Sequence, residues 1–123
     1  AAKLSKLRLA QMSYNEKNLK MAADYAQDFI KAWGKEDAFH WQGLLIISAA
    51  YLDQRQYDKA LPMLDDCIKG APKNAKDQAL FYKAQALIAM GKKDEAKKAL
   101  SEISDSYRDI AAPSLASLEK PKE

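Results

Sequence analysis

Few side chains in this sequence could carry out chemistry, and they do not group into a site. His40 is the only histidine, and Asp37 three residues earlier could form part of an acid–base pair with it. A catalytic or metal site needs several convergent partners, which the sequence does not supply. The position of His40 before Trp41, at the expected start of a helix, favours a capping or packing role. We therefore predict no catalytic residue, no metal site and no cofactor.

Cys67 is the only cysteine, so the chain forms no internal disulfide, and one thiol cannot by itself define a metal site. It lies seven residues after Ala60, on the inner face of its expected helix, which favours an inert buried thiol over a nucleophile. The sequence also contains no Gly-rich phosphate loop, paired metal-ligand motif or nucleophile elbow. The interpretation is that the protein is not an enzyme.

Charge is spread evenly along the chain. The formal net charge is +3, and the 20 basic and 17 acidic residues are interspersed, which favours solubility over nucleic-acid binding. The densest basic cluster is Lys92, Lys93, Lys97 and Lys98. Asp94 and Glu95 interrupt it, as is typical of a solvated helix face. We expect no nucleic-acid partner.

Length and composition predict one globular domain. The chain has 123 residues, of which 48% are apolar and 30% charged. The longest apolar stretch, Leu44 to Leu52, is far shorter than the ~20 residues that span a bilayer, so we expect no membrane insertion of this segment. The chain begins Ala1-Ala2-Lys3 without methionine, which suggests a processed or excised piece and leaves the compartment open.

The sequence favours helices throughout, because it has no Val or Thr and is rich in Ala, Leu and Lys. Gly34 and Gly70 are expected to end helices as left-handed C′ residues. Asp37 and Asn74 are expected N-caps, with Asp77 as an acidic third residue after Asn74. Six helices are expected between breaks at 15–18, 34–37, 53–56, 70–74, 91–93 and 104–106.

Internal repetition is the strongest signal. Small residues recur 12 positions apart on the two helices of each expected hairpin, at Ala10 and Ala22, Ser48 and Ala60, and Ala84 and Ala96. A small residue on each helix lets two backbones approach closely. The second residue of the pair advances by 38 positions from Ala22 to Ala60 and by 36 from Ala60 to Ala96. The pattern predicts three antiparallel hairpins.

These residues resemble the tetratricopeptide repeat family, whose unit is a 34-residue helix-turn-helix. The middle repeat matches best, with Leu44, Ile47, Ser48, Tyr51, Tyr57, Ala60, Leu64 and Pro72. The resemblance implies an all-α, right-handed solenoid in one domain, 1–118. Its expected parts are repeats at about 3–36, 38–74 and 75–108, a short capping helix at 110–118 and a mobile tail at 119–123.

In this family the first helix of each hairpin lines a concave groove that binds protein segments. The resemblance implies a groove with an apolar floor and polar amides, with Tyr14, Phe81 and Tyr82 as candidate anchors for an extended peptide or an amphipathic helix. The expected groove residues are Leu7, Arg8, Gln11, Tyr14, Asn15, Gln42, Leu45, Ile46, Ala49, Leu52, Asp53, Gln78, Phe81, Tyr82, Gln85 and Ile88.

The resulting hypothesis is a protein–protein interaction module, a scaffold or adaptor. A clamp for a terminal carboxylate is disfavoured, because Leu7, Gln11 and Ile46 stand where such clamps need a basic residue and asparagines. One alternative is a structural domain that forms homo-oligomers through the groove or the exposed end of the first helix. The chain also resembles bacterial domains that lie in the periplasm behind an N-terminal anchor, some of them associated with translocation or envelope assembly; a cytoplasmic location is the other reading.

Overall fold

The chain folds into a row of packed helices. The computed structural model describes residues 2–110, and no strand occurs in that range. A short 3-10 helix, η1 (Ala2–Leu4), precedes seven α-helices: α1 (Ser5–Asn15), α2 (Leu19–Ala32), α3 (His40–Asp53), α4 (Tyr57–Gly70), α5 (Lys73–Ala89), α6 (Lys93–Ser101) and α7 (Asp105–Ile110).

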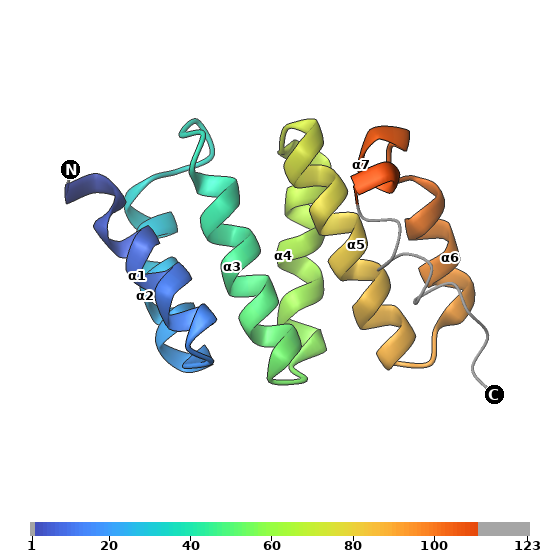
Figure 1. The fold of residues 1–123 in the computed structure, drawn as a ribbon, viewed down its shortest axis with the longest axis horizontal. Coiled ribbons are helices and arrows are strands. Elements are labelled where there is room, and N and C mark those ends of the chain that lie inside the picture. Colours follow the sequence, from blue (N-terminus) through green and yellow to red (C-terminus); the bar gives the residue numbers. More distant parts are fainter. Residues whose placement is uncertain (1, 111–123) are drawn as a thin grey trace.

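Consecutive helices pack against each other from α1 to α6, and α3 also contacts both α1 and α5. In Figure 1, α1, α3 and α5 lie side by side and run in the same direction, with α2 and α4 behind them. The helices therefore form two layers, an inner one of α1, α3 and α5 and an outer one of α2, α4 and α6. The prediction of an all-α helical repeat is confirmed.

The small residues 12 positions apart lie where the two helices of each hairpin meet. Ala10, Ala22, Ser48, Ala60, Ala84 and Ala96 are all fully or almost fully buried. Ser48 can occupy such a position because its hydroxyl donates a hydrogen bond to the Leu44 carbonyl, 2.9 Å away, so no polar group is left without a partner.

The turns inside the hairpins repeat the same backbone geometry. Lys17, Arg55 and Gly91 have φ values of 65°, 61° and 79°, in the left-handed region. Each is followed by a residue whose N–H bonds to a carbonyl of the preceding helix's last turn, as from Gln56 to Tyr51 (2.8 Å). These three positions have the same 38- and 36-residue spacing as the small-residue pairs.

The expected helix ends are wrong at several places. Gly34 and Gly70 are not left-handed, because α2 ends at Ala32 and Gly70 is the last residue of α4. Gly70 is instead needed for packing, since a Cβ there would lie 2.9 Å from the Trp41 ring. Asn74 lies inside α5 and caps nothing.

Asp37 lies two residues before the N-cap of α3, which is Phe39. Its carboxylate accepts a hydrogen bond from the Phe39 N–H (2.9 Å) and pairs with Lys3, and these two partners lower the pKa of Asp37. The residue therefore stabilises the loop before α3 without capping the helix.

Asp77 does not act as a first-turn acid of α5 but fixes the start of α7. It is buried, and its carboxylate accepts hydrogen bonds from the N–H (3.1 Å) and the hydroxyl of Ser104. The Ser104 hydroxyl in turn lies 3.4 Å from the Tyr107 N–H. A helix thus begins at Asp105, where a break was expected, while the expected cap at 110–118 lies outside the described residues except for Ile110.

Candidate functional site

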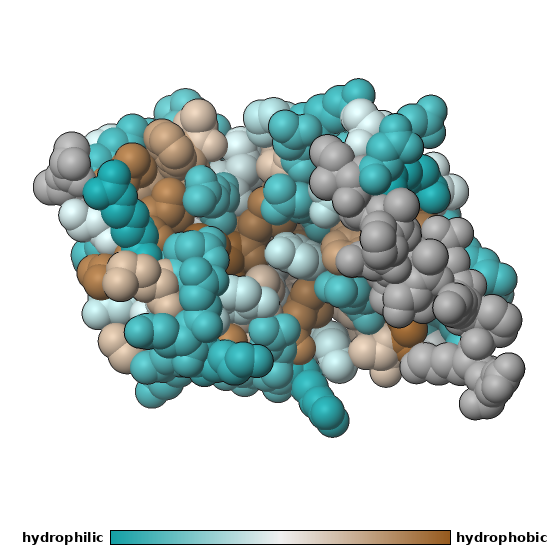
Figure 2. Space-filling model, in the orientation of Figure 1, coloured by the Kyte–Doolittle hydropathy of each residue, from teal (hydrophilic) through white to brown (hydrophobic). Residues whose placement is uncertain are grey.

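The inner layer is hollowed by a groove of about 410 Å³. Figure 2 shows apolar surface between polar side chains on this face. The lining comes from α1, α3 and α5 and from the loops before α3 and α5: Gln11, Tyr14, Ala38, Trp41, Gln42, Leu45, Ile46, Ala49, Pro72, Asn74, Ala75, Gln78 and Tyr82.

No side chain that lines the groove carries a formal charge. Leu45, Ile46 and Ala49 are the aliphatic part, and Tyr14, Trp41 and Tyr82 add aromatic rings. The polar groups of the lining are otherwise the side-chain amides, which can donate to or accept from a peptide backbone. The groove can therefore bury apolar groups while hydrogen-bonding a main chain.

The central helix α3 supplies most of this surface, because it is packed on several sides. Nearly all of its residues from His40 to Ala50 are buried, with Gln42 the exposed exception. Gly43 allows the close approach of α2, since a Cβ there would lie 2.8 Å from an Ile30 methyl carbon. The rigid packing of α3 keeps the groove preformed.

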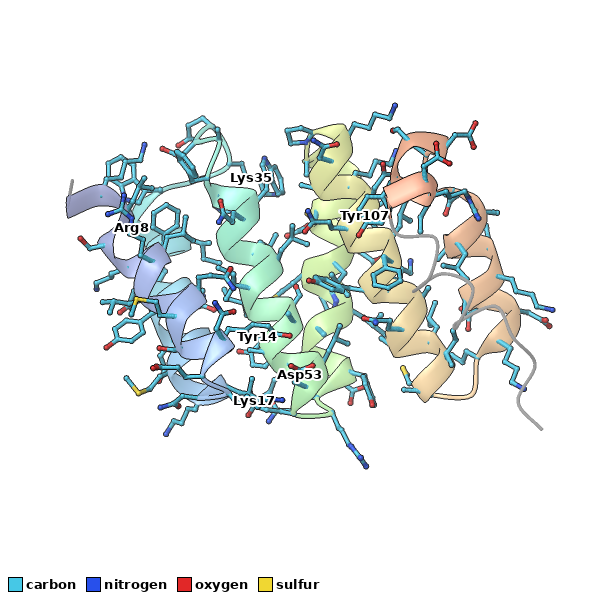
Figure 3. The ribbon with its side chains drawn as sticks, viewed as in Figure 1. Arg8, Tyr14, Lys17, Lys35, Asp53 and Tyr107 are labelled. Carbon is cyan, nitrogen blue, oxygen red and sulfur yellow. The ribbon has the colours of Figure 1, made fainter. Side chains whose placement is uncertain are left out.

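Asp53, at the end of α3, is a charged side chain that interacts with the lining. Figure 3 shows Tyr14 and Asp53 at the same end of α1 and α3, and the Asp53 carboxylate acts on the Tyr14 hydroxyl. Burial, followed by the interaction with Asp53, raises the pKa of Tyr14. The phenol therefore stays protonated and remains a donor at any physiological pH.

His40 and Cys67 both have structural roles. His40 is buried, and its Nδ1 lies 2.8 Å from the Trp33 carbonyl oxygen. Cys67 is fully buried, and burial raises its pKa to about 11. Within residues 2–110, no three His, Cys, Asp or Glu side chains are grouped as a metal ion would require.

A family model described as tetratricopeptide repeat matches residues 51–119. This chain belongs to the tetratricopeptide repeat family. The match begins at the end of α3 and includes α4 to α7, so it covers more than half of the chain. Comparison with curated proteins and with solved structures gave no significant match. No helix among the described residues of this tetratricopeptide repeat protein is long and apolar enough to cross a membrane.

Many of the expected groove residues lie together in the lining. They come from all three inner helices and are Gln11, Tyr14, Gln42, Leu45, Ile46, Ala49, Gln78 and Tyr82. Arg8 and Asn15 are exposed on α1 outside the lining, and Asp53 lies just beyond it. Gln85 is half-buried and also outside it.

Other expected groove residues pack inside the protein. Leu7 is buried in the core of the first hairpin. Phe81 packs on the core of the third hairpin, its ring centroid lies 6.4 Å from that of Tyr107 of α7, and it is not among the lining residues. Leu52 and Ile88 likewise pack against core clusters. Phe81 and Leu45 therefore do not both line the groove, and their expected side-by-side position stays a prediction.

The sequence interpretation missed Ala38, Trp41, Pro72, Asn74 and Ala75. Trp41 precedes Leu45 by four residues and Ala75 precedes Gln78 by three, so helical periodicity could have found both. Trp41 belongs to both the core and the groove, because it is buried and also lines the groove. Ala38 and Pro72 come from loops, whose path no periodicity predicts.

Proposed function

We propose that this protein is an interaction module that binds a peptide or an amphipathic helix of another protein in the groove between α1, α3 and α5. Tetratricopeptide repeats generally mediate interactions between proteins and are non-catalytic. The observation that supports the proposal is the lining itself, which is apolar and aromatic, carries amides and has no formal charge. Such a surface suits apolar side chains presented by a regular backbone.

The size of the groove limits what it takes up. About 410 Å³ accommodates a few large side chains and not a folded domain. Interface energy concentrates in a few buried anchors, and Tyr14, Trp41 and Tyr82 offer rings to pack against them. We therefore expect a partner segment with two to four apolar residues on one face.

The proposal is tested by selecting binders from a random library of displayed 16-residue peptides. The expected sequences carry apolar residues three or four positions apart. A synthetic selected peptide should bind Gln42→Arg and Gln78→Arg at least ~tenfold more weakly, because each substitution puts a charge into an uncharged groove. Gln27→Arg, the same substitution on the outer helix α2, is the matched control and should leave the affinity within twofold.

Failure of the proposal would be equally clear. Equal affinity of the parent and both groove variants would move the binding site elsewhere, and a library that yields no binder would reject peptide binding. Far-ultraviolet circular dichroism of each variant checks that the helices are intact.

Self-association is the alternative function, and the first hairpin provides an observation that favours it. Leu9 and Met12 of α1 and Met21 of α2 are exposed, with Met12 at 57%. Light scattering over a concentration series measures the mass directly. A mass that doubles with concentration, and that returns to one chain in Met12→Glu, would support association through this end of the row.

A further inference from the structure

The two ends of the groove differ in charge. The inner helices run in the same direction, so their C-terminal ends lie together at one end of the groove (Figure 1). None of α1, α3 and α5 has a basic residue in its last turn. The outer helices do have one, at Lys31, Lys69 and Lys98. The last turns of the inner helices therefore hold no cation against the negative ends of their dipoles, although Lys17 and Arg55 follow in the turns after α1 and α3.

Asp53 increases this negative potential. It is the last residue of α3, where a carboxylate is unfavourable because it adds to the negative end of the dipole. Asp53 is exposed, and no cationic group among residues 2–110 lies within 4 Å of its carboxylate. Lys17 and Arg55 lie in the neighbouring turns at this end; both are exposed, and neither forms an ion pair with another residue in the range 2–110.

The surroundings of Asp53 would suit a cationic side chain. Tyr14 and Asp53 lie at the same end of α1 and α3 (Figure 3), and the Asp53 carboxylate is exposed and able to accept several hydrogen bonds. Burial and, to a smaller extent, the negative charge of Asp53 raise the pKa of Tyr82. Tyr82 of α5 therefore also experiences the charge of Asp53. Phenol rings attract cations to their faces, and the aliphatic stem of Lys or Arg packs well on apolar surface such as Ala49.

Resting on the peptide-binding groove proposed above, we propose that the partner segment carries a lysine or arginine next to its apolar residues and that Asp53 binds this cation. The groove then recognises two features of its partner, the apolar side chains and the cation. The uncharged lining takes the apolar side chains, and the carboxylate at the C-terminal ends of α1 and α3 fixes the orientation of the segment.

The test repeats the peptide selection with three proteins, the parent, Asp53→Asn and Asp24→Asn. Asp24 is exposed on the outer helix α2, so its substitution removes the same charge far from the groove. The parent and Asp24→Asn should enrich apolar peptides with Lys or Arg at one flank. Asp53→Asn should enrich the same apolar pattern without that flank.

The affinities of one synthetic selected peptide and of its Lys→Gln or Arg→Gln analogue are then measured. Together they give the coupling energy between the peptide's cation and Asp53. The basic peptide should bind the parent about threefold to tenfold more tightly than the analogue, and Asp53→Asn should bind both equally. The inference would be overturned if the peptides selected by the parent carried no Lys or Arg beside their apolar residues, or if Asp53→Asn still selected such a Lys or Arg. Either result would leave the groove proposal intact. Binding that is unaffected by Gln42→Arg and Gln78→Arg would overturn both.

Discussion

At the scale of single residues, burial rather than residue type determines the chemistry of Cys67. The thiol is fully buried at the junction of the second and third hairpins, and its Sγ lies 3.7 Å from the Ala75 carbonyl oxygen. Burial, with a smaller contribution from Asp66, raises its pKa from 9.0 to about 11. The neutral thiol predominates in the folded state at physiological pH, and a neutral thiol is a poor nucleophile.

We predict that Cys67 reacts with a thiol reagent at pH 8 at least ~100-fold more slowly in the native protein than in urea, because reaction requires opening of the core. The raised pKa of Cys67 also makes the free energy of unfolding depend on pH. The free energy of unfolding should be independent of this thiol below about pH 8.5 and should fall as the pH rises toward 11, because the unfolded chain loses the proton first. Equal labelling rates with and without urea would contradict the buried position.

Local sequence reasoning found some residue roles and not others. Burial of Ala10, Ala60 and Ala84 followed from their spacing, because close helix crossings require small side chains. The role of Asp77 could not be predicted, since its partner Ser104 is 27 residues away. The sequence pattern placed Asp77 in the first turn of its helix, but α5 begins at Lys73, so Asp77 lies past that turn and bonds to Ser104 instead.

At the scale of helices and turns, the left-handed residue of each hairpin is a repeated element with different residue types. Gly91 adopts this conformation without steric cost, whereas Arg55 adopts it against the preference of a residue with a Cβ. A Cβ at position 91 would meet nothing within 4 Å. The cost of a side chain at position 91 therefore comes from the left-handed backbone conformation alone.

We predict opposite effects at these two equivalent turns. Gly91→Ala should lower the free energy of unfolding by about 1 kcal/mol, and Arg55→Gly should raise it by about 0.5 kcal/mol, less because glycine also loses more backbone entropy on folding. Urea unfolding of both variants measures the signs. Two changes of the same sign would show that the turns are not equivalent.

Docking of α7 depends on Asp77. We predict that Asp77→Ala costs about 1 to 3 kcal/mol, because two hydrogen bonds from Ser104 are lost inside the protein. Amide hydrogen exchange in α7 should accelerate, while exchange in α1 to α4 stays unchanged. Ser104→Ala, which keeps the N–H donor, should have a smaller effect on both measurements, and unchanged exchange in α7 would contradict this anchoring.

At the scale of the whole molecule, the fold was predictable because it is built from one repeated unit. Breaks such as 15–18 and 53–56, together with the 12-residue spacing, were enough to give the hairpins and their order. The groove was predictable only in part. Leu7 and Phe81 have the same repeat periodicity as groove residues, but Leu7 lies in a hairpin core and Phe81 packs on the core of the third hairpin. Such outcomes depend on packing between distant segments.

The central claim is that partners bind on the inner layer, and methyl NMR tests it most directly. Spectra of the labelled protein would be recorded while the selected synthetic peptide is added. We predict that the methyl signals of Leu45, Ile46 and Ala49 shift and saturate with the affinity measured for the peptide, while those of Leu64 and Leu100, in the cores between the layers, change little. Shifts confined to methyl groups of α2, α4 and α6, with Leu45, Ile46 and Ala49 unchanged, would contradict it.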